Sequence, residues 1–483
     1  MTNKLFGTDL IEAGQQSGKW FAKALEVGNA ILQEGGTREQ ALAAAIAFAP
    51  PPTIGLQDAS DVPLHINIRA ENDFEQENID KVIASMKSLI ETPVVKAAAI
   101  MPDACPTGSS GEIPVGGIVA SEAIHPGMHS ADICCSLAIS VFKGVAPADL
   151  LNAVHKVTHF GPGGRERGNQ IRPSDKVMQD FADNIYLEKQ QSVAIEHFAT
   201  QGDGNHFAYV GQLKSTGETV LVTHHGSRAP GARLYKTGMK VADRFRKELS
   251  PKTQTINAWI PADSVEGETY WSALQIIRQW TKENHFAIHD LAADVLGVKV
   301  NDRFWNEHNF VFRKSDGLFY HAKGATPAFS GWSHDATDLT IIPLNMAEPI
   351  LIVHGSNADH GLGFSPHGAG RNFSRSGHVR NLCAEFNVDK NSLGDQHFKE
   401  IIARETKGLD VRFFSGHPDV SELPSAYKNA AAVKQQIKDY GLADIVEEVI
   451  PYGSIMAGDC LINAPWRRKK QQKRDQASSL EMR

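Results

Sequence analysis

The chain has 483 residues, of which 41% are hydrophobic and 22% charged, with a formal net charge of -7 at pH 7. This composition excludes a collagen-like, fibrous or wholly disordered protein. The five cysteines are too few for a disulfide scaffold, and two of them are adjacent, so a cytoplasmic location is expected. We find no secretory signal and no apolar run of about 18 residues, which predicts that no segment spans a membrane.

Residues 1–54 are expected to form a helical extension before the main domain. Between Ser17 and Gln33 apolar residues recur at helical spacing, and the glycine pair at 35–36 ends the run. Thr37 followed by Gln40 is the pattern of a capping box that opens a second helix, which ends before the three prolines at 50–52. We expect this helical hairpin to pack on the main domain and to have no catalytic role.

Residues 55–463 are expected to form one large domain of the α+β class, with a mixed sheet. The predicted elements in chain order are strands at 94–104, 113–124 and 131–142, a helix from Ser174 to Leu187, a strand at 219–225, a helix from Tyr270 to Glu283, and a strand at 348–356. These elements do not alternate as they do in a doubly wound sheet, which favours α+β.

Residues 464–483 form a basic tail, with six lysines and arginines in the eight positions 467–474. Such a run can contact the phosphates of a nucleic acid. We expect a solvated, disordered tail instead, because the run is terminal and ends in polar residues.

Five histidines share a local pattern, in which an apolar run ends and glycine or asparagine adjoins the imidazole. They are His206, His224, His308, His354 and His367. Strand ends and glycine loops are the places where a rigid scaffold presents side chains to a cleft. By contrast, His285 and His289 lie four residues apart without the glutamate of a metalloprotease motif, so we expect them to be structural.

The run Asp132-Ile133-Cys134-Cys135 adds a carboxylate and two thiols to these imidazoles. In a regular strand Asp132 and Cys134 share a face, whereas a bulge or turn lets Asp132 and Cys135 converge, and both arrangements stay open. A mixed set of oxygen, sulfur and nitrogen ligands suits zinc, manganese, iron or cobalt. The wide spacing of these residues favours a catalytic centre, and a pair of metals suits phosphoryl chemistry.

The segment from His367 to Arg371 combines an imidazole with small residues and a guanidinium group. The backbone amides of Gly368, Ala369 and Gly370 can approach phosphate oxygens, and Arg371 with Arg375 can clamp them. Lys323 stands in a second basic, glycine-containing loop and is a further candidate phosphate contact. Together these residues predict a nucleotide or RNA phosphate site with His367 as the nucleophile.

The ordered motifs resemble those of the RtcB-type RNA ligases. They are MPDA at 101–104, IPVGGIVA at 113–120, HPGMHSADICC at 125–135, GDGNHF at 202–207, HHGSR at 224–228, IPADSVEGETYW at 260–271, HNFV at 308–311, KGAT at 323–326, HGSN at 354–357 and HGAGRNFSR at 367–375. The resemblance implies an enzyme of RNA repair or tRNA splicing that uses GTP and two manganese ions per subunit. An enzyme of this kind would join RNA 3'-phosphate or 2',3'-cyclic phosphate ends to 5'-hydroxyl ends. An archease-like activator is a candidate partner beside the RNA.

The resemblance also implies roles for individual residues. Asp132, Cys135 and His206 would hold one manganese ion, and Cys135 would bridge to a second ion held by His224 and His308. His367 would be the catalytic residue that takes GMP from GTP. The implied nucleotide contacts are Asn205, His206, Phe207, His308, Asn309, His354, Gly355, Ser356, Asn357, His367, Gly368, Ala369 and Gly370.

Several positions depart from the family pattern and suggest a divergent paralog. Cys105 stands where the family usually has histidine, residues 354–357 read HGSN where it has PGSM, and Ala457 stands in place of a lysine that contacts the guanine nucleotide. An alternative is therefore a dinuclear metal phosphoesterase that opens cyclic phosphates without ligation. A non-catalytic RNA-binding protein, which rests on the basic tail alone, is the third hypothesis.

Overall fold

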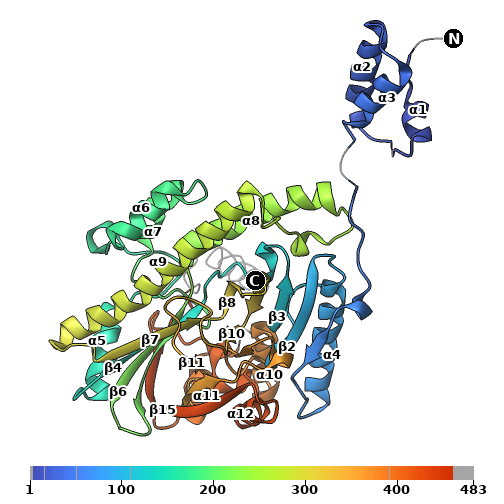
Figure 1. Ribbon diagram of the computed structural model, residues 1–483. Helices are drawn as coiled ribbons and strands as arrows, with labels where there is room; N and C mark the ends of the chain where they lie inside the picture. Colours follow the sequence, from blue (N-terminus) through green and yellow to red (C-terminus); the bar gives the residue numbers. More distant parts are fainter. Residues whose placement is uncertain (1–3, 16, 50–51, 109, 391, 461–483) are drawn as a thin grey trace, which may run out of the picture. The chain divides into compact units, whose positions relative to one another are not determined.

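The computed structural model describes residues 4–15, 17–49, 52–108, 110–390 and 392–460 (Figure 1). The basic tail predicted at 464–483 lies outside these residues. The chain divides into two compact units, one of residues 1–55 with 244–252, and the other of residues 56–243 with 253 onward.

The smaller unit contains α1 (Gly7–Glu12), α2 (Trp20–Gln33) and α3 (Arg38–Ile46). The predicted pair of helices is confirmed, and Thr37 caps α3 by accepting from the Gln40 amide at 3.2 Å. Helix α1 was not predicted because six residues are too few to show a helical period. Gly28 lets α2 and α3 approach closely, since a Cβ atom there would lie 2.8 Å from the Ala41 carbonyl oxygen.

The larger unit is of the α+β class, as predicted. Its main sheet has the strand order β11-β12-β15-β5-β6-β4-β7, with β14 paired to β15. These strands are β4 (Ser136–Phe142), β5 (Phe207–Leu213), β6 (Thr219–His225), β7 (Asp302–Glu307), β11 (Leu339–Ile342), β12 (Ile350–Gly355), β14 (Asp410–Phe413) and β15 (Ala443–Met456).

A second sheet has the order β1-β2-β3-β9-β8, and a third pairs β10 with β13. Their strands are β1 (Leu64–Ile66), β2 (Val95–Cys105), β3 (Val115–Ser121), β8 (Asn309–Arg313), β9 (Phe319–Lys323), β10 (Ala325–Pro327) and β13 (Phe364–Pro366).

Helices cover these sheets (Figure 1). They are α4 (Asp73–Ile90), α5 (Pro147–Val157), α6 (Asp175–Asp183), α7 (Gln191–Glu196), α8 (Arg228–Leu249), α9 (Val265–Leu296), α10 (Arg375–Glu385), α11 (Asp395–Glu405) and α12 (Ala430–Asp439). Helices α5 and α9 pack on the main sheet, and α4 packs on β2. Among the described residues, no helix is long and apolar enough to cross a membrane.

The central strands β4 and β6 of the main sheet are buried on both faces, which explains their nearly continuous apolar runs. On β6, Val220 and Val222 belong to one hydrophobic cluster, and Leu221 belongs to the cluster beneath α5 and α9. The predicted helix at 270–283 is confirmed but runs over 32 residues as α9. The helix predicted at 174–187 is confirmed as α6, with Ser174 as its cap, and ends at Asp183.

Candidate metal centre and nucleotide cavity

Strand ends bring the five candidate metal ligands together. His224 lies near the end of β6, where it pairs across the sheet with Leu137 of β4 and with Phe207 of β5. His206 directly precedes β5, Cys135 directly precedes β4, and His308 stands between β7 and β8. Neighbouring strands therefore place residues that are up to 176 positions apart in the sequence together, where these strands of the main sheet begin or end.

A turn at residues 132–135 decides which cysteine joins this group. The strand predicted at 131–142 begins only at Ser136. Cys134 has a φ of 56°, in the left-handed region, and the Cys135 amide donates to the Asp132 carbonyl oxygen at 3.2 Å. The prediction of a strand across 132–135 is wrong because this turn interrupts it, and Asp132 converges with Cys135. Gly226 makes room for the carboxylate, since a Cβ atom there would lie 2.1 Å from Asp132 Oδ1.

The ligand atoms form two triads that share one sulfur. In the first triad, His206 Nε2 lies 3.0 Å from Asp132 Oδ2 and 3.6 Å from Cys135 Sγ. In the second, His224 Nε2 lies 3.2 Å from both Cys135 Sγ and His308 Nε2. Within each triad all three ligand atoms lie within 4.8 Å of one another.

The tautomers indicate that these atoms are arranged for cations. The Nδ1 atom of His206 faces the Gln201 carbonyl oxygen at 2.8 Å, and that of His224 faces the Asn205 carbonyl oxygen at 3.1 Å. Each Nδ1 must therefore carry the proton, which leaves a lone pair on each Nε2. The lone pair of His206 Nε2 faces the Asp132 carboxylate at 3.0 Å, a contact that is repulsive unless a cation or a proton lies between the two atoms. The donor set thus fits two metal ions.

Burial determines the protonation states of several candidate ligands. It lowers the pKa of His224 to about 3, with the imidazoles of His206 and His367 adding to the effect, and it lowers the pKa of His308 as well. Both rings are therefore neutral near pH 7. Burial and then the Asp132 carboxylate raise the pKa of the Cys135 thiol, so its thiolate needs a cation beside it.

His367 lies beside this group and is oriented by a carboxylate. The rings of His308 and His367 are 4.7 Å apart between centroids. His367 Nδ1 donates to Asp103 Oδ2 at 2.6 Å, and the Asp103 side chain is fully buried. This contact fixes the proton on Nδ1 and leaves Nε2 free as a nucleophile. Gly370 allows it, because a Cβ atom at that position would lie 1.9 Å from the Asp103 carbonyl oxygen.

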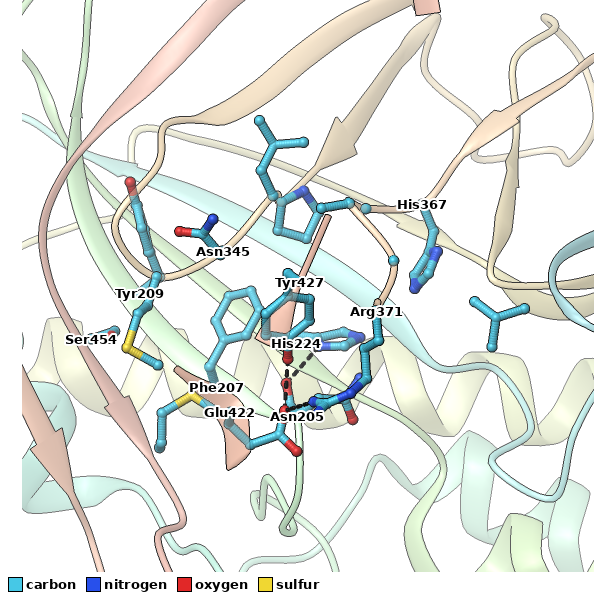
Figure 2. Close-up of a pocket in the computed structure, with 18 of the residues that line it drawn as sticks. Asn205, Phe207, Tyr209, His224, Asn345, His367, Arg371, Glu422, Tyr427 and Ser454 are labelled. Atoms are coloured by element: carbon cyan, nitrogen blue, oxygen red, sulfur yellow. Dashed lines mark hydrogen bonds and ion pairs between the residues drawn. The ribbon is translucent and has the colours of Figure 1, made fainter. Parts of the chain in front are cut away.

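A cavity of about 350 Å³ extends from His367 and His224. This volume is in the range of small-molecule sites. Figure 2 shows His367 at one end of the cavity and Tyr209 and Ser454 at the other. Besides these, the lining residues are Cys105, Val115, Asn205, Phe207, Pro343, Leu344, Asn345, Met346, Ile350, Gly368, Ala369, Gly370, Arg371, Ser374, Arg375, Glu422, Tyr427 and Met456.

The predicted nucleotide contacts are divided among two cavities and their surroundings, and two of them, His206 and His308, line neither cavity but belong to the ligand triads. Asn205, Phe207 and residues 367–370 line the main cavity. His354, Gly355 and Asn357 line a separate cavity of about 180 Å³, and the Ser356 hydroxyl donates to the Leu442 carbonyl oxygen at 2.8 Å. Asn309 does not line the main cavity, and its side-chain oxygen accepts from the Gly324 amide at 2.7 Å.

The predicted phosphate contacts are already paired with carboxylates. Lys323 Nζ lies 2.9 Å from Glu112 Oε1. Arg371 lies 3.0 Å from Glu422 Oε2, and Arg375 pairs with the other oxygen of the same carboxylate. The two arginines line the main cavity, so they can contribute positive charge to it, whereas Lys323 does not line it.

Asp103 and several cavity residues, among them Tyr209, Glu422, Tyr427, Ser454 and the segment 343–346, were not predicted. Asp103 stands in the MPDA motif, but nothing in its sequence context shows that it contacts a histidine 264 positions away. The turn Pro343-Leu344-Asn345-Met346 lines the main cavity. This segment carries the proline and methionine of the PGSM pattern, whereas His354, Gly355 and Asn357, which were matched to that pattern, line the other cavity. The match of the pattern is therefore corrected from residues 354–357 to residues 343–346, and the shared proline and methionine were the available signal.

The structural role expected for His285 and His289 agrees with their hydrogen bonds. His285 Nδ1 lies 2.7 Å from the Thr223 hydroxyl, and its Nε2 lies 3.0 Å from the Ser136 hydroxyl. His289 lies 2.8 Å from Thr223 Oγ1 and 2.7 Å from Ser140 Oγ. Every ring nitrogen of the pair thus has a protein partner.

Comparison with known proteins identifies the family of the chain. Residues 151–457 match the family model described as tRNA-splicing ligase RtcB. The tRNA-splicing ligase RtcB of Thermococcus kodakarensis is 24% identical over 462 residues, which span 79% of this chain and 92% of that protein. The protein of the same name from Aeropyrum pernix is 25% identical over 440 residues, 74% of this chain and 88% of its own.

The family match covers more than half of the chain and includes His206, His224, His308 and His367, while Asp103, Asp132 and Cys135 precede it. The alignment with the Thermococcus kodakarensis protein spans a larger share of the chain. The chain belongs to the RtcB family of RNA ligases.

Proposed function

We propose that the protein is a manganese- and GTP-dependent ligase of RNA repair or tRNA splicing. It joins RNA 3'-phosphate or 2',3'-cyclic phosphate ends to 5'-hydroxyl ends, with His367 as the residue that carries GMP. One observation supports this most directly. His367 stands at the end of a nucleotide-sized cavity, next to the two metal-ligand triads, with Asp103 holding its Nδ1 proton.

Asp132, Cys135 and His206 would hold one metal ion, and Cys135, His224 and His308 the other. When bound, such ions neutralise the charge of phosphate groups during transfer. The arginine pair at residues 371 and 375 adds positive charge on the cavity wall.

In the first proposed step, His367 Nε2 attacks the α-phosphorus of GTP. A phosphorus–nitrogen bond forms, the bond to the bridging oxygen breaks, and pyrophosphate leaves with that oxygen. Asp103 accepts the Nδ1 proton's hydrogen bond throughout, so the ring keeps its orientation and its developing positive charge is stabilised.

In the second step, an oxygen of the RNA 3'-phosphate attacks the phosphorus on His367, the phosphorus–nitrogen bond breaks, and GMP passes to the RNA end. In the third step, the 5'-hydroxyl oxygen of the other RNA strand attacks the RNA 3'-phosphorus. The hydroxyl proton passes to solvent, a phosphodiester bond forms, and the bond between the 3'-phosphorus and the oxygen bridging to GMP breaks, so that GMP leaves with that oxygen. A cyclic phosphate end first needs addition of water to open the ring.

The test is formation of a covalent adduct with α-labelled GTP and manganese. We expect an adduct that is labile in acid and stable in alkali, and that His367→Ala abolishes. His360→Gln is the control, because this exposed histidine lies outside the main cavity. Absence of an adduct with every nucleotide and metal tried would refute the proposal.

The alternative function, a phosphoesterase that opens cyclic phosphates, needs the metal centre but not His367. It predicts hydrolysis of a cyclic phosphate without any nucleotide, and the His367→Ala variant would retain that activity. Strict dependence of turnover on nucleotide excludes it.

A further inference from the structure

We infer that the end of the cavity that receives the base has no dedicated site for guanine, so that the rates at which ATP and GTP load His367 differ by less than about 100-fold. This inference rests on the proposed function. A nucleotide whose α-phosphate lies at His367 must place its base toward the opposite end of the cavity. We call that end the base end, and define it by Tyr209, Asn345 and Ser454 (Figure 2). Met346 and Met456, which also line the cavity, lie one residue after Asn345 and two residues after Ser454 in the chain.

Guanine differs from adenine by two adjacent donors, the N1–H and the 2-amino group, and by the O6 acceptor. A protein selects guanine most strongly with a carboxylate that accepts from both donors, or with a cation at O6. The discriminating question is therefore whether the base end offers an unpaired carboxylate or ammonium group.

Among the described residues that line the cavity, the one carboxylate is Glu422, and there is no lysine. Glu422 is saturated. Its Oε2 lies 3.0 Å from Arg371 and accepts from the Tyr427 hydroxyl at 2.6 Å, and its Oε1 pairs with Arg375. Recruiting Glu422 to guanine would strip two arginines of their partner, at a cost that a base contact does not repay.

Position 457, where the family lysine contacts the nucleotide, also offers nothing. The Ala457 side chain is fully buried and belongs to the hydrophobic cluster beneath α5 and α9. Ser454 and Met456 line the cavity, while Ile455 joins Ala457 in that cluster. No charge therefore reaches the base end from this stretch of chain.

The base end does hold polar groups that await a ligand. The Ser454 side chain is 1% exposed, and its hydroxyl has no hydrogen-bond partner. Asn345 uses its side-chain oxygen to accept from the Ala347 amide at 2.9 Å, which leaves its amino group available to donate. A hydroxyl can donate or accept, so this pair can form hydrogen bonds with either purine.

Apolar walls complete the base end. Met346, Met456 and the ring of Tyr209 line the cavity, and the Tyr209 hydroxyl donates away from it to the Val449 carbonyl oxygen at 3.0 Å. Such walls bind the faces of both purines. A pocket without complementary polar groups discriminates near-isosteric ligands by about 100-fold at most, whereas a dedicated hydrogen-bonding site reaches about 10,000-fold or more.

The test measures the preference between ATP and GTP both in adduct formation and in equilibrium binding. Adduct formation is timed with α-labelled ATP and with α-labelled GTP in manganese, and equilibrium binding of each nucleotide to His367→Ala is measured by calorimetry. We expect the two nucleotides to differ by less than about 100-fold in both measurements. A GTP preference above that value overturns the inference while the proposed function stands. An adduct with neither nucleotide overturns both.

Ser454→Ala tests the assigned contact. We expect weaker binding of both nucleotides by a similar factor of several-fold, since the lost hydroxyl serves either base. Unchanged binding, or a change for one nucleotide alone, contradicts the assignment. Thr219→Ala is the control, because it removes a buried hydroxyl from the start of β6, outside the cavity, and should leave nucleotide binding unchanged.

Discussion

Two groups of histidines meet β6 from opposite faces, and they differ in what their ring nitrogens contact. His224 directs Nε2 at Cys135 and at the Nε2 atom of His308. Its neighbour His225 stacks on His285, with ring centroids 3.4 Å apart, in a network of serine, threonine and asparagine groups. Residue type and burial are the same in both groups. The partner atoms separate the two groups: the Nε2 atom of His224 faces other candidate ligand atoms, whereas the ring nitrogens of His285 face hydroxyl groups.

The largest expected effect comes from removing a histidine whose Nε2 faces other candidate ligands. His224→Ala should eliminate one metal ion and abolish adduct formation, because no other described side chain completes the Cys135 and His308 pair. Metal content per chain is measured after dialysis against manganese. The loss of metal affinity should exceed the roughly 10- to 100-fold loss that follows removal of a group that only hydrogen-bonds to a ligand. Two retained ions would mean that His224 is not a ligand.

Asp103→Asn should be next in size, because it tests a group that acts through a histidine. An amide can present its amino group to His367 Nδ1, which favours the wrong tautomer and removes the compensating negative charge. We expect adduct formation to slow by about 1,000- to 10,000-fold, by analogy with the aspartate of a catalytic triad. Metal content should not change. A normal rate would show that the 2.6 Å contact is not needed for catalysis.

How much of this was visible in the sequence depends on the range of each contact. Local signals sufficed for the Thr37 cap, the strand at 219–225 and the placement of histidines at strand ends. Contacts such as that of His367 with Asp103 join residues from different sheets and leave no local pattern. The turn at Cys134 stayed open because its left-handed φ is rare for cysteine and is held by buried surroundings.

Histidines whose ring nitrogens face hydroxyl groups should affect the stability of the protein and not its metal content. His285→Ala leaves the Ser136 and Thr223 hydroxyls without this partner and opens a space beneath β6. We expect the free energy of unfolding to fall by about 3–5 kcal/mol, with two metal ions retained in the folded protein. Chemical denaturation and metal analysis measure the two quantities. Loss of metal at full stability would reverse the distinction between the groups.

The same burial predicts sensitivity to acid. Burial lowers the pKa of His289 to about 3, and that of His125 and His129 to about 4. The unfolded chain therefore binds more protons below pH 6.5, and stability is lost as the pH falls from 6.5 toward 4. At pH 4, each of these histidines lowers the free energy of unfolding by on the order of 3 kcal/mol relative to its value at pH 7. Denaturation midpoints measured between pH 7 and pH 4 should fall steeply, and a flat profile would contradict neutral burial.

The smallest effect is expected at Cys134, and it sharpens the contrast with its neighbour. Cys134 is fully buried but belongs to neither metal-ligand triad. Alanine shares its reluctance to adopt a φ of 56°, so Cys134→Ala leaves the backbone strain unchanged and loses only the packing of the sulfur, about 1 kcal/mol. Two metal ions and near-normal adduct formation should remain. Cys135→Ala, one residue on, should lose metal from both triads, because each of them includes its sulfur. If both variants lost the same amount of metal, the two cysteines would not differ in their role, and the assignment of Cys135 as the shared ligand would fail.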